Sequence, residues 1–82
     1  MKGQVAEINY QRGMVAVLTE DGDYTILEML EEGIKVGDIL EWPTHNPLGR
    51  ETIHNLTKEI RVEVYFQNHW VNKDQLQQQL LY

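Results

Sequence analysis

Apolar and polar residues alternate along most of this chain in short segments, and this period of two is typical of strands that bury one face. The alternation predicts strands over residues 4–10, 14–19, 24–28 and 39–42, and a long strand region over 51–67 that is broken near Thr57 and Lys58. Asp21–Gly22 is a hairpin signal, because this pair supplies the positive φ angles that tight turns need. The pattern therefore predicts a mainly β protein, a small barrel of short strands.

The end of the chain has a different pattern. Asn72 is a suitable N-cap for a short helix predicted over 73–81, and Leu76 and Leu80 are four residues apart on one face of it. Residues 60–82 carry a large apolar load for their length. One interpretation is that this segment packs back on the barrel and extends its core. The alternative is self-association through strand pairing or helix packing, with these residues in the interface: Val62, Val64, Phe66, Trp70, Leu76 and Leu80.

Length and composition limit the class of protein. The chain has 82 residues, 41% of them hydrophobic and 24% charged, which predicts one globular domain. It has no cysteine, which excludes a disulfide scaffold, a thiolate zinc site and a cysteine nucleophile. The first ten residues lack the apolar run of a signal peptide, and no segment approaches the roughly 18 apolar residues of a membrane span. We therefore expect a cytoplasmic protein without a membrane segment.

The net charge of the chain is unfavourable for binding nucleic acid through its phosphates. Seven Lys and Arg residues against thirteen Asp and Glu residues give a net charge of −6. Non-specific affinity for nucleic acid comes mainly from Lys and Arg that displace counterions, and the basic residues here form no cluster in the sequence.

A series of turn and loop residues occurs in a recognisable order, namely Gly3, Val5, Asn9, Arg12–Gly13, Asp21–Gly22, Glu31–Gly33, Gly49–Arg50 and Asn55–Lys58. This order resembles a cold-shock domain over roughly residues 2–59, and the resemblance implies a five-stranded OB-fold barrel that binds single-stranded RNA and DNA. Residues 60–82 lie outside the resemblance, and we expect them to form a C-terminal strand and helix extension of the barrel 1–59, packed on it or on a partner subunit.

The aromatic rings on which that family stacks bases are absent from the matching positions. Stacking contributes about 1–3 kcal/mol per base, so losing three or four rings removes about 3–12 kcal/mol, whereas a micromolar site holds about 8 kcal/mol. Glu7 and Glu28 add repulsion toward phosphates. We therefore expect a face that docks protein, with partial cover by the C-terminal helix and a residual nucleic-acid face as the alternatives. Its residues are Met14, Ala16, Thr25 and Leu27.

A displaced nucleic-acid site is the second hypothesis. Trp42, with His45, Arg50 and His54 near it in sequence, is interpreted either as the rim of such a site or as an apolar plug beside Pro43. The contacts expected for a displaced, weakly basic face are Lys2, Tyr10, Arg12, Lys35, Trp42, Arg50 and Lys58.

No motif predicts catalysis, a metal or a cofactor. His45, His54 and His69 lack the spacing of metal ligands, the run 20–23 is too short for a calcium loop, and the chain has no glycine-rich phosphate loop. The sequence thus predicts a non-catalytic OB-fold binding module whose partner is another protein or a second copy. Binding of single-stranded nucleic acid is the disfavoured alternative.

Overall fold

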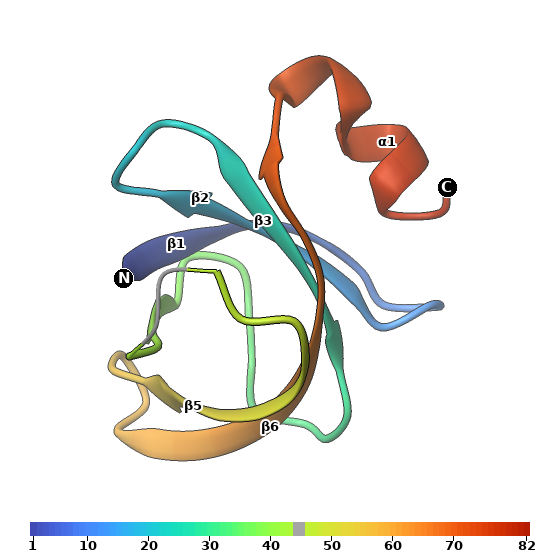
Figure 1. Ribbon diagram of the computed structural model, residues 1–82. Helices are drawn as coiled ribbons and strands as arrows, with labels where there is room; N and C mark the ends of the chain where they lie inside the picture. Colours follow the sequence, from blue (N-terminus) through green and yellow to red (C-terminus); the bar gives the residue numbers. More distant parts are fainter. Residues whose placement is uncertain (44–45) are drawn as a thin grey trace.

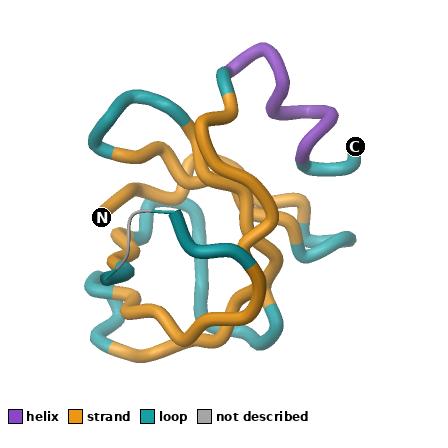
Figure 2. Tube along the Cα trace, in the orientation of Figure 1, coloured by secondary structure: helices purple, strands orange, loops and turns teal. Residues whose placement is uncertain are grey.

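Six antiparallel strands form a closed barrel, with a short helix after the last strand. The computed structural model describes residues 1–43 and 46–82 (Figures 1 and 2). The strands are connected side to side in the closed order β1-β2-β3-β6-β5-β4. This confirms the predicted fold class, with six strands instead of five. The elements are β1 (Lys2–Asn9), β2 (Met14–Thr19), β3 (Tyr24–Met29), β4 (Ile39–Glu41), β5 (Gly49–Asn55), β6 (Ile60–Val71), the 3₁₀ turn η1 (Lys73–Gln75) and α1 (Leu76–Gln79).

The strand β6 closes the barrel, because it pairs with β3 along one edge and with β5 along the other. The predicted strand region over 51–67 is a hairpin of β5 and β6, and the predicted break near Thr57 and Lys58 is its turn. Residues 60–71 are therefore part of the barrel wall and no extension of a barrel that ends at residue 59. Alternation alone does not reveal this, since a barrel strand and an added strand have the same period.

The barrel interior holds one apolar cluster. Trp42 is buried there and packs edge-to-face on Phe66, with 5.3 Å between ring centroids. Its indole nitrogen is buried and has no hydrogen-bond partner within the described residues. Of its two interpretations, the apolar plug agrees with this burial and a binding rim does not. The interior cluster comprises Val5, Ile8, Val15, Val17, Leu27, Ile34, Leu40, Trp42, Ile53, Val62, Val64 and Phe66.

The C-terminal helical segment lies outside the barrel wall (Figure 1), and a second apolar cluster joins it to β2 and β3. Two hydrogen bonds attach the end of the chain to β1. The Asn9 side chain donates to the Leu80 carbonyl at 2.8 Å, and the Tyr82 hydroxyl donates to the Ile8 carbonyl at 3.1 Å. The outer cluster comprises Met14, Ala16, Ile26, Val71, Leu76 and Leu80, with Tyr24 against it. Among the described residues, no helix has the length and apolarity that crossing a membrane requires.

The pairing of β2 with β3 corrects the predicted faces. Val15 pairs with Leu27 and Val17 pairs with Thr25, and paired residues of an antiparallel ladder share a face. Leu27 thus points into the barrel with Val15. The expectation that Thr25 and Leu27 share an outer face with Met14 and Ala16 was wrong. Alternation assigns two faces within each strand, but the register of the hairpin decides which face of β3 joins which face of β2.

We expect Leu80→Ala to lower the free energy of unfolding by about 2–4 kcal/mol, because Leu80 is fully buried in the outer cluster. It should also increase binding of an apolar dye, since loosening of the helical segment uncovers Met14 and Ala16. Urea denaturation measures the first effect. The matched control is Gln77→Ala on the exposed side of the same helix, and equal losses for both variants would contradict the packing described.

Candidate functional site

The predicted docking face is not exposed. Met14 and Ala16 lie on the outer wall but are buried under the C-terminal helical segment, while Leu27 is inside the barrel. Thr25 is buried too, and its hydroxyl lies 2.9 Å from Nδ1 of His69. The alternative of cover by the helix agrees with the positions of Met14 and Ala16. Met14 and Ala16 are buried because Leu76 and Leu80 of the helical segment pack on this wall in the outer cluster.

The residues expected to self-associate are mostly buried within the chain. Val62, Val64 and Phe66 lie in the barrel interior, and Leu76 and Leu80 lie in the outer cluster. They pack back on the barrel, as the first interpretation of this segment stated. Trp70 is the exception, with 67% of its surface exposed.

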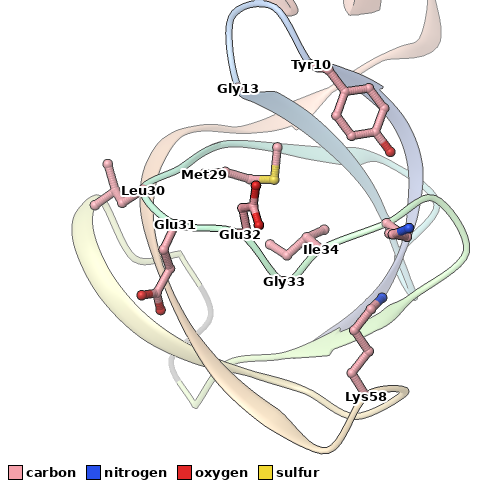
Figure 3. A pocket seen from close by; sticks show the side chains of 10 residues that line it. Tyr10, Gly13, Met29, Leu30, Glu31, Glu32, Gly33, Ile34 and Lys58 are labelled. Carbon is pink, nitrogen blue, oxygen red and sulfur yellow. The ribbon is translucent and has the colours of Figure 1, made fainter.

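One end of the barrel is open and carries a hollow of about 530 Å³ (Figure 3). The turn after β1, the loop that follows β3 and the turn between β5 and β6 meet at this end. We call it the barrel-end hollow. Its lining residues are Tyr10, Gly13, Met29, Leu30, Glu31, Glu32, Gly33, Ile34, Lys35 and Lys58.

Asp38 attaches the loop after β3 to the β5–β6 turn. Its carboxylate accepts hydrogen bonds from the Asn55 side chain at 2.8 Å and from the Lys35 backbone N–H at 2.9 Å, and it forms an ion pair with Lys58. Burial by itself raises the pKa of Asp38, but the hydrogen bonds from Lys58, Asn55 and Lys35 lower it by more. The pKa therefore lies below its ordinary value of 3.8. Charge-assisted hydrogen bonds of this kind keep the rim of the hollow in place.

Gly33 lets the same loop approach β6 closely. Its φ is +132°, and a Cβ atom there would lie 2.8 Å from Cγ1 of Val62. The Gly33 carbonyl accepts a hydrogen bond from Asn55 at 2.8 Å. Any side chain at this position would push the loop off the barrel and change the shape of the hollow.

The barrel-end hollow has an apolar floor and charges of both signs. Met29 and Ile34 supply apolar surface, and Glu31 lies across the hollow from Lys58 (Figure 3). At the rim, Tyr10 is 65% exposed and Leu30 is 41% exposed. A pocket of a few hundred Å³ with an apolar base and a few polar groups has the usual form of a binding site.

Three of the predicted nucleic-acid contacts meet in this hollow, namely Tyr10, Lys35 and Lys58. Arg12 lines a separate groove. Trp42 is buried, so its prediction as a contact was wrong. Lys2 on β1 and Arg50 on β5 do not line the hollow, and their strands are not neighbours in the closed order.

Of the residues named with Trp42, His54 lines a small pocket beside it, whereas Arg50 does not line that pocket. Arg50 is exposed and pairs with Glu63 at 2.5 Å, and the hydrogen bond and charge of Glu63 raise the pKa of its guanidinium. His54 is exposed on β5. His45 lies outside the described residues.

A second groove, of about 570 Å³, runs between the outer wall and the C-terminal helical segment. Sequence reasoning missed it, although the glutamine-rich run 75–79 was a signal. Half of its eight lining side chains are amides, and three of these bond within the chain: Gln67 with Glu28 at 3.3 Å, and Asn68 with Gln79 at 3.4 Å. The lining residues are Arg12, Met14, Glu28, Gln67, Asn68, Gln78, Gln79 and Leu81.

Within residues 1–43 and 46–82, no three side chains of His, Cys, Asp or Glu lie close enough together to hold a metal ion. Comparison of the chain with protein-family models, with curated proteins and with solved structures finds no match. The function must therefore be argued from the surfaces described above.

We expect Asp38→Asn to lower the free energy of unfolding at pH 7 by about 2 kcal/mol, because it removes the charge that Lys58 and Asn55 bind. The pKa of Asp38 is lower in the folded than in the unfolded state, so its contribution is present above the unfolded pKa. The contribution is lost as the pH falls through the native pKa.

The wild type should therefore lose stability relative to Asp38→Asn between about pH 5 and pH 2, measured by urea denaturation. Asp74→Asn, at an exposed carboxylate, is the control and should change little. Parallel pH profiles for wild type and Asp38→Asn would contradict this role.

Proposed function

We propose that this protein is a non-catalytic binding module that docks another protein at the barrel-end hollow. The observation on which this depends is the rim of the hollow, where Tyr10 and Leu30 are exposed beside buried Ile34. Exposed aromatic and aliphatic side chains around a concave surface are typical of protein interaction sites.

The charges of the hollow indicate the chemistry of the partner segment. Glu31, Glu32, Lys35 and Lys58 stand on the rim, so both signs are present, although Lys58 is already paired with Asp38. An apolar side chain flanked by both an acidic and a basic residue would match the floor and the rim. Such mixed charges favour the correct orientation of a partner more than they add affinity.

Partner binding is favoured over pairing between copies of this chain. Five of the six residues that would have formed a self-association surface are buried in the two apolar clusters, and only Trp70 among them is exposed. In the closed strand order, β6 has a neighbour on each side, so its edges are occupied by β3 and β5.

A photo-crosslinker at the rim tests the proposal. The chain has no cysteine, so Leu30→Cys provides a single attachment point at the hollow, and Gln77→Cys provides a matched point on the exposed side of the helix. In lysate of the source cells, we expect a discrete adduct from the Leu30 position that is absent from the Gln77 position. Tyr10→Ser should reduce its yield several-fold, since aromatic residues dominate binding at such sites. Identical adducts from both positions, or no adduct at Leu30, would reject the hollow as the docking site.

Single-stranded nucleic acid is the second candidate, favoured by the meeting of Tyr10, Lys35 and Lys58 in one hollow. Glu31 and Glu32 in the same hollow oppose it. The reporter is Tyr10→Trp, compared with the unsubstituted chain, because Trp42 is buried and the exposed Trp70 contributes equally to both. We expect no saturable quenching by oligouridine at micromolar concentration and low salt. Saturable quenching that weakens steeply with added salt would support the nucleic-acid function instead.

A further inference from the structure

The last part of β6 pairs irregularly with β3. Ile26 pairs with Asn68 and Leu27 with Phe66, so β6 has one extra residue there, and between Asn68 and Val71 it has another. Each extra residue is a β-bulge, a feature that re-aims a side chain and is frequent beside functional sites. The second bulge contains His69 and Trp70.

Trp70 has a backbone conformation that a tryptophan rarely adopts. Its φ is +55°, in the left-handed region, and 67% of its surface is exposed. The left-handed conformation is unfavourable for a bulky residue, and residues held in it cluster at functional sites. Trp70 recovers little of this cost by its own burial, although the bulge that contains it buries the neighbouring His69 and Val71.

His69 holds the bulge in place. Its ring lies 2.9 Å from the Thr25 hydroxyl through Nδ1, and Nε2 lies 2.5 Å from the carbonyl of Pro47. Because a carbonyl can only accept, Nε2 is the donor of that bond. The ring also stacks on Phe66, with 5.7 Å between centroids, and meets the edge of Trp70 at 6.2 Å. The base of Trp70 is thus fixed while its indole ring faces solvent.

The surroundings of Trp70 are apolar and acidic. Leu48, next to the Pro47 that His69 contacts, is 69% exposed. Tyr24 pairs with Val71, which brings the end of β6 to the β2–β3 turn with Glu20, Asp21 and Asp23. Asp74 follows Trp70 by four residues. The basic groups at this end are Lys2, Lys73 and the amino terminus, whose nitrogen donates to the Trp42 carbonyl.

We propose that Trp70 and Leu48 form a second docking surface, at the barrel end opposite the barrel-end hollow, for a partner-protein segment with Arg or Lys beside an apolar residue. A guanidinium or ammonium group over the indole face gains a cation–π interaction. The acidic β2–β3 turn adds long-range attraction for the same cation, although Glu20 already accepts a hydrogen bond from the Lys2 backbone N–H and Asp23 accepts one from the Thr19 hydroxyl. This inference does not depend on the proposed function of the hollow.

Replacing Trp70 distinguishes a ring that is exposed for binding from a ring that stabilises the fold. Trp70→Asn should raise Tm by about 2–5 °C, because asparagine tolerates the left-handed conformation and little packing is lost. Tyr65→Asn is the matched control, at an exposed aromatic residue on the same strand, and should leave Tm unchanged or lower it. An unchanged or lower Tm for Trp70→Asn would show that the ring serves the fold, and it would overturn the proposal.

Selection from a phage library of random peptides tests the surface itself, with the wild-type chain as bait. We expect enriched peptides with Arg or Lys next to an apolar residue. Their affinity should fall about 10-fold or more for Trp70→Asn, change little for Tyr65→Asn and Leu30→Ser, and decrease with added salt.

Three results would overturn the proposal. The first is a set of enriched peptides without basic residues, or no enrichment. The second is equal binding of the peptides to Trp70→Asn and wild type. The third is a dimer of the wild-type chain, seen by light scattering, that Trp70→Asn abolishes, since a second copy would then occupy the surface. Leu30→Ser alters the hollow alone. If the hollow turns out not to dock a partner, the peptide test of the Trp70 surface is therefore unaffected.

Discussion

Closure of the barrel by β6 is the constraint on which the rest of the structure depends. Its twelve residues form hydrogen bonds to β3 on one side and to β5 on the other, so no strand pairing can propagate from these edges. Closure also separates the apolar residues into an interior cluster and an outer one. Of residues 60–71, the interior takes Val62, Val64 and Phe66, and the outer cluster takes Val71.

The outer cluster follows from the same constraint. The wall of β2 and β3 places Met14, Ala16 and Ile26 outside the barrel, and apolar residues gathered on a wall need cover from water. Leu76 and Leu80 supply that cover, and Asn9 and Tyr82 attach the segment by hydrogen bonds to backbone carbonyls. A flat wall that a barrel of this kind can offer to ligands is occupied here by the chain itself. The two docking surfaces proposed above lie instead at the ends of the barrel.

The two ends differ in how their surfaces are made. At the barrel-end hollow, the Asp38 network holds one loop against one turn, and the binding groups are ordinary side chains on that frame. At the other end, the backbone of β6 is strained at Trp70, and His69 maintains the strain through contacts with Thr25 and Pro47. The backbone strain at the exposed Trp70 agrees with the proposal that this ring contributes free energy when a partner binds.

The sequence by itself determined the strands, the hairpin at Asp21–Gly22, the break near Thr57 and Lys58, and the amphipathic helix with Leu76 and Leu80. These features follow from local periodicity and turn chemistry, which act over a few residues. Only the tertiary structure decided that Leu27 faces inward, that β6 closes the barrel, and that Tyr10 and Lys58 meet in one hollow. Register, bulges and closure depend on pairing between distant segments, and a period of two is the same for either register and either neighbour.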